Sequence, residues 1–219
     1  MTIEAVIWDF GGVFTTSPFE SFNRLEAELG APLDHIRRVN ATDPDHNAWA
    51  LFERNEIDAA RFDELFLAES AALGFPIRGA DVLPRLSGDL RPRMVAALQA
   101  CKGRFRVGCI TNNVASEHSP GQAEGQRMAG AMAQVLPLFD AVIESSKAGV
   151  RKPDPRIYLM MCDLLGVRPE ACVYLDDLGI NCKPAAGLGM MAIKVVSEEQ
   201  ALRDLARVTG LRLDAEAAA

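Results

Sequence analysis

Residues 6–14 read Val-Ile-Trp-Asp-Phe-Gly-Gly-Val-Phe, and this stretch decides what fold the rest of the chain is expected to form. The apolar run Ala5–Trp8 is short and continuous, which is typical of a parallel strand buried on both faces. Asp9 ends the run, at the strand end where ligands bind in open α/β sheets. Gly11 and Gly12 then allow a sharp turn and a close backbone approach to a ligand. The alternative for this stretch alone is a strand followed by a turn, with Asp9 merely capping it.

The composition is that of an ordinary globular protein with an acidic balance. The chain has 219 residues, 49% of them hydrophobic and 24% charged, and a net charge of −7. This charge argues against nucleic acid and anionic membranes as partners. The five cysteines form no C-x-x-C pair, so buried thiols in a reducing compartment are expected rather than disulfides or a zinc site. No leader pattern or apolar run of about 18 residues is present, and we expect a cytoplasmic location.

Residues 15–90 contain no pattern of a buried strand and are expected to be helical. Ser17 and Pro18 suggest an N-cap followed by proline at the first helical position, and Gly30 is expected to end that helix. Further helices are expected over residues 33–39 and 58–73. Large apolar side chains recur here at helical spacing, which predicts a small helical bundle. The turn 43–46 is expected to be solvated.

From Arg91 onward, helices alternate with short apolar strands. The expected strands cover residues 106–110, 141–143, 171–175 and 191–196, and the expected helices cover 92–102, 122–136, 154–165 and 182–188, with a last helix capped by Ser197. This alternation predicts a doubly wound parallel sheet with right-handed crossovers. The predicted fold class is therefore α/β, with a core of residues 1–14 and 91–219. An all-helical cap of residues 15–90 is expected to be inserted after the first strand.

Polar side chains follow the predicted strands. They are Asp9 after the first strand, Thr111 and Asn112 after the second, Lys152 beyond the third, and Asp176 and Asp177 after the fourth. Parallel strands place their carboxyl ends along one edge of a sheet, so these groups are expected to converge. Three carboxylates repel one another without a cation, and Mg²⁺ prefers carboxylates, water and phosphate as ligands. No histidine follows a strand, which argues against zinc, histidine acid–base chemistry and a Ser-His-Asp triad.

Taken in order, these motifs resemble those of the haloacid dehalogenase superfamily. The matching motifs are Asp9-x-Gly11, Thr111-Asn112, Lys152-Pro153-Asp154-Pro155 and Asp176-Asp177. The resemblance covers essentially the whole chain, and residues 174–190 most resemble the N-terminal phosphatase domain of soluble epoxide hydrolase and its bacterial relatives. In this family a helical cap lies between the first and second motifs, where residues 15–90 lie here.

The resemblance implies a covalent mechanism that depends on a metal ion. Asp9 would attack phosphorus and form an aspartyl-phosphate. Mg²⁺ would be held by a carboxylate oxygen of Asp9, the backbone carbonyl of Gly11 and Asp177, with Asp176 assisting. The substrate would be a small phosphorylated metabolite, for example a sugar phosphate.

The resemblance also implies how the phosphate is bound. The Thr111 hydroxyl and the Asn112 backbone would bind a phosphate oxygen, and the Gly11–Gly12 turn would let the backbone approach it. Lys152 would neutralise Asp9 and the charge of the transferred phosphoryl group. Lys147 is an alternative for the lysine, but Lys152 is preferred because prolines hold the backbone around it.

One position departs from the pattern of the family's phosphatases. These usually carry a second aspartate two residues after the nucleophile, where this chain has Gly11. That aspartate protonates the leaving group and later activates water, and such help is typically worth about 10²–10⁴-fold in rate. Thr15, Thr16 or the turn 43–46 could supply a substitute acid.

Three functions therefore stay open. The first is a Mg²⁺-dependent phosphatase for leaving groups that need little protonation, such as sugar-1-phosphates or aryl phosphates. The second is a 2-haloacid dehalogenase, in which Asp9 attacks carbon without a metal; the Asp176-Asp177 pair weighs against it. The third is a non-catalytic binder of phosphate ligands, and the retention of Asp9 and Lys152 weighs against it. We rank the phosphatase first.

Overall fold

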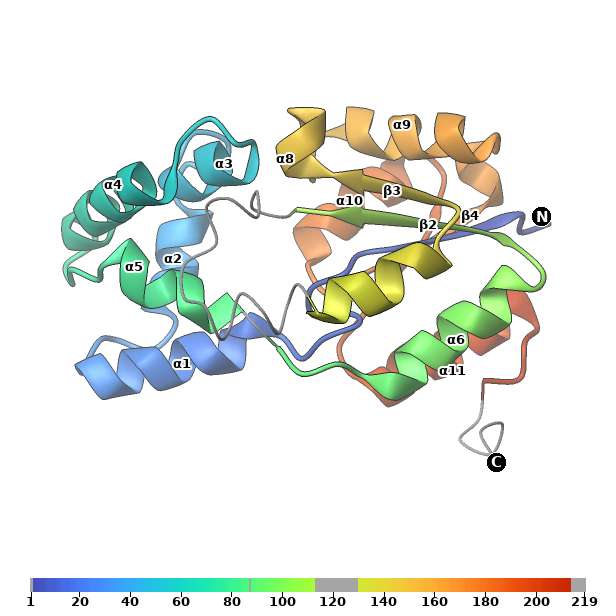
Figure 1. The fold of residues 1–219 in the computed structure, drawn as a ribbon, viewed down its shortest axis with the longest axis horizontal. Coiled ribbons are helices and arrows are strands. Elements are labelled where there is room, and N and C mark those ends of the chain that lie inside the picture. Colours follow the sequence, from blue (N-terminus) through green and yellow to red (C-terminus); the bar gives the residue numbers. More distant parts are fainter. Residues whose placement is uncertain (1, 87, 113–129, 214–219) are drawn as a thin grey trace.

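The structure is a computed structural model, and it describes residues 2–86, 88–112 and 130–213 (Figure 1). Within these residues, five parallel strands form one sheet in the order β3-β2-β1-β4-β5. The strands are β1 (Ala5–Trp8), β2 (Arg106–Thr111), β3 (Ala141–Glu144), β4 (Cys172–Asp176) and β5 (Met191–Lys194). The predicted parallel α/β sheet is confirmed, with the strand that precedes Asp9 at its centre.

Both faces of the sheet are covered, which explains the continuous apolar run of β1. Helices α6 (Pro92–Lys102) and α11 (Glu198–Thr209) cover one face, and α9 (Pro155–Leu165) and α10 (Gly179–Gly187) cover the other. Val6 and Trp8 pack into the first apolar cluster, whereas Ala5 and Ile7 pack into the second. All four side chains are fully buried. Successive side chains of a strand point to opposite faces, so each position of β1 must be apolar.

Short helices complete the core. They are η3 (Leu136–Leu138), α8 (Ser145–Ala148) and η4 (Pro169–Ala171). The helix predicted over residues 122–136 is seen from residue 130, and residues 122–129 of that prediction lie outside the described part of the chain. The start predicted for α10 was too late, because the helix begins at Gly179 rather than Cys182. The Asp176 carboxylate accepts the Leu178 N–H at 2.8 Å and holds the chain as the helix begins.

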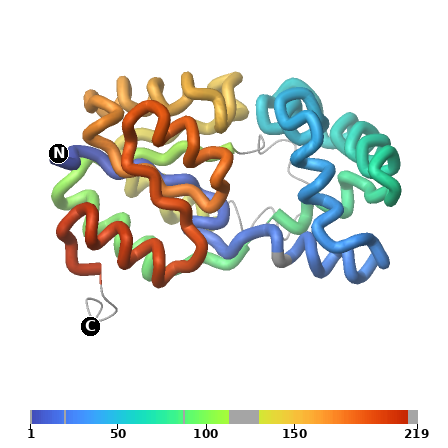
Figure 2. The backbone as a smooth tube through the Cα atoms, turned by 180° about the vertical axis from the view of Figure 1, so that it is seen from behind, coloured from blue at the N-terminus to red at the C-terminus, as the bar shows by residue number. Residues whose placement is uncertain are grey.

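Residues 18–86, called the helical segment below, form a separate group of helices. These are α1 (Pro18–Leu29), α2 (His35–Ala41), α3 (Ala48–Glu53), α4 (Ala59–Ala72), α5 (Gly79–Val82) and η1 (Leu83–Leu86). Figures 1 and 2 show this group to one side of the sheet, near the carboxyl ends of the strands. Its helices enclose an apolar cluster of their own around Phe52, Phe62 and Phe66.

The entry to and exit from the helical segment run side by side. Thr15 pairs with Leu90 in an antiparallel bridge, and the Arg91 N–H donates to the Phe14 carbonyl at 2.8 Å. This arrangement is compatible with an insertion after the first strand, although the exact domain boundaries stay a prediction.

Within the helical segment, Gly30 ends α1 in a left-handed conformation (φ 72°), as its sequence position predicts.

The environment of the cysteines agrees with the expectation of buried thiols. All five are free and buried. No helix among the described residues is long and apolar enough to cross a membrane.

Candidate functional site

Three carboxylates meet at the carboxyl ends of the two central strands. Asp9 follows β1, Asp176 ends β4, and Asp177 comes next; one oxygen of each lies within 4.8 Å of the others. The strands are direct neighbours, and the Asp9 N–H donates to the Leu175 carbonyl at 2.8 Å. The parallel register therefore brings together residues that lie about 170 positions apart in the chain.

Lys152 lies between two of these carboxylates. Its Nζ is 2.7 Å from Asp9 Oδ1 and 2.8 Å from Asp176 Oδ2, and the side chain is 1% exposed. Burial lowers the pKa of Lys152, but the neighbouring Asp176 and Asp9 carboxylates together raise it above its usual value. The lysine is therefore a fixed cation. Lys147, the other candidate, pairs with Glu144 and is mostly exposed.

Asp176 is held in place by more than the lysine. Its carboxylate accepts hydrogen bonds from the Tyr174 hydroxyl (2.5 Å), the Leu178 N–H (2.8 Å) and Asn181 Nδ2 (3.1 Å to each oxygen). It is fully buried. A carboxylate with so many donors serves chiefly to orient Lys152.

Asp9 and Asp177 keep more of their coordination capacity. Asp9 Oδ1 accepts from Lys152 and from the Phe10 N–H at 2.7 Å; among the described residues, Oδ2 accepts no hydrogen bond. Burial, with Asp176 nearby, raises the pKa of Asp177 to about 6. Burial also raises the pKa of Asp9, against the attraction of Lys152. If all three carboxylates are ionised, the single ammonium leaves two negative charges, and this donor set fits a hard divalent cation.

The two glycines after Asp9 have different constraints. Gly12 has a φ of 71°, and a Cβ built on it would lie 2.2 Å from Asp177 Oδ2. Its carbonyl accepts from Arg91 Nη1 at 3.0 Å, and its N–H donates to Thr15 Oγ1 at 3.3 Å. A Cβ on Gly11, by contrast, would meet nothing within 4 Å. Of the two glycines that follow Asp9, only Gly12 is therefore required to be glycine by the surrounding structure.

Thr111 ends the neighbouring strand β2 and is buried, and Asn112 directly follows it. The Asn112 side chain forms a reciprocal pair with the backbone of Lys152: Oδ1 accepts its N–H at 2.9 Å, and Nδ2 donates to its carbonyl at 3.0 Å. This amide fixes the lysine's backbone, a role that the sequence did not predict. The structure thus places all the predicted site residues around one edge of the sheet.

Sequence reasoning missed Glu53 and Arg151. Glu53 ends α3 in the helical segment, yet its Oε2 accepts from Arg151 Nε at 2.6 Å and from Asn112 Nδ2 at 3.2 Å. The Glu53 carbonyl accepts from Ser145 Oγ at 2.8 Å, and Arg151 Nη1 donates to the Pro44 carbonyl at 2.8 Å. Burial raises the pKa of Glu53, and Arg151 opposes that rise. These contacts attach the helical segment to the loop that carries Lys152.

Comparison with known proteins places this geometry in a family context. Residues 3–189 match the haloacid dehalogenase-like hydrolases. The chain is 30% identical over 213 residues to phosphatase MT3486 of Mycobacterium tuberculosis, covering 89% of this chain and 88% of that protein. It is 28% identical to mouse bifunctional epoxide hydrolase 2 over 96% of this chain but 39% of that protein. It spans between 19% and 39% of the length of its mammalian relatives.

Solved structures show the same fold. A haloacid dehalogenase family enzyme from Bacteroides thetaiotaomicron, in complex with magnesium and inorganic phosphate, superposes with a TM-score of 0.57 at 17% identity. The match covers 87% of this chain and 93% of that one.

The different constraints on Gly12 and Gly11 generate a stability prediction. Gly12→Ala forces a side chain into a left-handed conformation and against Asp177. We expect the free energy of unfolding, measured by urea denaturation, to fall by about 1–3 kcal/mol or more. Gly11→Ala is the matched control and should change it by less than about 0.5 kcal/mol. Equal losses in the two variants would show that the turn does not distinguish the two glycines.

The contacts of Glu53 generate a second prediction. Glu53→Ala removes the carboxylate that faces the largely buried Arg151, so the unfolding free energy should fall by about 3 kcal/mol. The control is Glu56→Ala, because Glu56 pairs with Arg54 while 49% of its side chain is exposed. Such exposed pairs contribute about 0–1 kcal/mol. Urea denaturation of both variants measures the difference, and a loss in Glu53→Ala no larger than in the control would exclude this buried contact.

Proposed function

Since the chain belongs to the haloacid dehalogenase-like hydrolase family, we propose that it hydrolyses the phosphate monoester of a small metabolite through an aspartyl-phosphate on Asp9. The observation that carries this proposal is the buried Lys152 ammonium between Asp9 and Asp176, with Asp177 beside them. Phosphoryl transfer requires chiefly positioning and charge stabilisation, and this constellation offers both.

In this proposal, Asp9 is the nucleophile. Its Oδ1 is fixed by Lys152 and by the Phe10 N–H, so the carboxylate is oriented before substrate arrives. An oriented nucleophile needs less reorganisation in the transition state, and positioning of this kind lowers the barrier. Lys152 stays protonated because two carboxylates surround it, so its charge is available to stabilise the transferred phosphoryl group. Thr111 and the Asn112 backbone would bind phosphate oxygens at the end of β2.

The same site would hold Mg²⁺. Asp9, Asp177 and the Gly11 carbonyl are the proposed ligands, and Asp176 would assist by fixing Lys152 beside them. When bound, the ion would offset the negative charge of the phosphate and of the carboxylates. The raised pKa of Asp177 reflects burial beside Asp176, and a cation at this point would relieve that repulsion.

The helical segment is proposed to act as the cap. It faces the carboxyl ends of the strands, and Glu53 joins it to the Lys152 loop (Figure 1). Asp9 is 7% exposed, and in this proposal substrate access depends on the position of the cap. The similarity to a relative named as a phosphatase supports the same activity, and the acidic cluster weighs against a metal-free dehalogenase.

The direct test is phosphate release from a panel of phosphorylated metabolites and aryl phosphates, with and without Mg²⁺. We expect release only with Mg²⁺, and a loss of at least about 10³-fold in Asp9→Asn, because the nucleophile is gone. Asp163→Asn, at an exposed position of α9, is the control and should retain activity. No release from any compound, together with no beryllium fluoride adduct on Asp9, would favour a binding protein instead.

The open space at Gly11 allows a test of the missing acid. Gly11→Asp places a carboxyl group where the family's phosphatases usually have one, and a Cβ there meets nothing within 4 Å. We expect turnover of alkyl phosphates to rise by about tenfold or more, and that of aryl phosphates to rise less, because alkoxide leaving groups need protonation. Gly11→Asn is the control, because its side chain has almost the same size but its amide cannot act as a general acid. An equal gain with Asn, or on both substrate classes, would contradict the prediction.

A further inference from the structure

Two cysteines meet at the end of the sheet opposite the candidate site. Cys162 on α9 and Cys172 at the start of β4 place their sulfur atoms 4.0 Å apart. The side chains are 2% and 0% exposed. A disulfide needs about 2.0 Å between sulfurs, so rotation of the two side chains must close a gap of about 2 Å. The other three cysteines show no sulfur–sulfur contact among the described residues.

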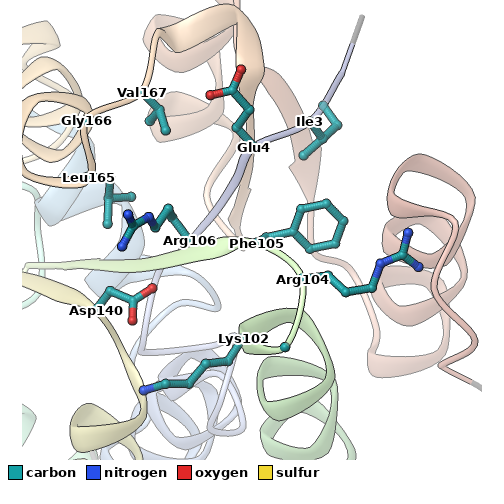
Figure 3. A pocket seen from close by; sticks show the side chains of 11 residues that line it. Ile3, Glu4, Lys102, Arg104, Phe105, Arg106, Asp140, Leu165, Gly166 and Val167 are labelled. Carbon is teal, nitrogen blue, oxygen red and sulfur yellow. The ribbon is translucent and has the colours of Figure 1, made fainter.

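Cys162 is buried, but it lies next to a surface pocket that is separate from the candidate site. It lines a shallow pocket together with Glu4, Gly166 and Arg168. Glu4 directly precedes β1, so this pocket lies at the amino ends of the strands, away from Asp9. Figure 3 shows the adjoining pocket, in which Glu4, Gly166 and Val167 are labelled and which shares these residues with the first. Cys172, by contrast, is fully buried and lines neither of these two pockets.

The hydrogen bonds of the pair distinguish the two sulfurs. The Cys172 thiol has two acceptors within reach, the Cys162 sulfur at 4.0 Å and the Arg168 carbonyl at 3.3 Å, and its single proton serves one of them at a time. The hydrogen bond between the thiols lowers the pKa of Cys162, although burial opposes this. That hydrogen bond, together with burial, raises the pKa of Cys172. Burial raises the pKa of Cys101 and Cys182 to about 12, and it also raises the pKa of Cys109. Cys162 is thus the cysteine best suited to react as a thiolate.

We propose that Cys162 and Cys172 form an oxidisable dithiol, which hydrogen peroxide converts to a disulfide. The Cys162 thiolate attacks one peroxide oxygen, the O–O bond breaks, and Cys162 becomes a sulfenic acid while the other oxygen leaves as water after taking a proton. Cys172 then attacks the sulfenic sulfur, the S–S bond forms, the S–O bond breaks, and a second water leaves. Overall, two thiols lose two electrons and two protons, and one hydrogen peroxide becomes two waters.

This position joins two elements that carry residues of the candidate site. Tyr158 lies one turn before Cys162 on α9, and Tyr174 lies two residues after Cys172 on β4. Their rings pack edge to face with centroids 5.2 Å apart. The Tyr174 hydroxyl donates to Asp176, and the Tyr158 hydroxyl donates to the Asn181 carbonyl. The disulfide would therefore fix α9 against β4 directly behind the groups that orient Asp176.

The test is oxidation of the folded, full chain by a small excess of hydrogen peroxide. We expect the free thiols to fall from five to three, the intact mass to fall by about 2 Da, and a dithiothreitol-reducible peptide to link Cys162 with Cys172. In Cys172→Ser, dimedone should label Cys162, because no partner remains to resolve its sulfenic acid. In Cys162→Ser, Cys172 should stay a thiol.

Cys101→Ser is the matched control, since Cys101 packs on the other face of the sheet and should leave the disulfide unchanged. The proposal is overturned if the wild-type chain keeps five thiols, if the linked peptide contains another cysteine, or if dimedone labels Cys172 rather than Cys162. The wild-type peptide map decides the matter even if a serine variant fails to fold.

Discussion

The site depends on one buried cation shared by two carboxylates. Lys152 Nζ lies within 2.8 Å of both Asp9 and Asp176, and none of the three side chains is more than 10% exposed. Removing these charges from water is costly unless each is paired and hydrogen-bonded. The fold meets this requirement on the Asp176 side, where Tyr174, Asn181 and a backbone N–H all donate to one carboxylate. Lys152 therefore has one rigid partner, and Asp9 is held against the same ammonium.

The sheet and the helical segment both serve this arrangement. Parallel pairing of β1 with β4 places Asp9 beside Asp176, and Asn112 at the end of β2 fixes the backbone of Lys152. Glu53 then binds Asn112 and Arg151 from the helical segment. Any movement of this segment away from the strands must break those contacts, so the enclosure of the site and the order of the lysine loop are coupled.

The parts that could be predicted from the sequence are those with a local or periodic signal. The buried run before Asp9, the alternation of strands and helices, and the polar residue that follows a strand are each visible within a short stretch of the chain. Glu53 and Arg151 are separated by 98 residues, and neither position has a pattern that distinguishes it from a surface charge. The sulfur contact of Cys162 with Cys172 is likewise visible only in three dimensions. Such pairings follow from the packing of α3 on the strand ends and of α9 on β4, which periodicity does not determine.

In the turn after Asp9, packing requires glycine at position 12 but not at position 11. Gly12 must be glycine, because its backbone is left-handed and any Cβ would collide with Asp177. Gly11 has an ordinary backbone and open space where a side chain would start. Packing therefore does not explain why this chain lacks an aspartate at position 11. Under the proposed function, a leaving group that departs without a proton from the enzyme would have no need of an acid there. Charge stabilisation by Lys152 and a bound cation is the contribution that such a substrate would still require.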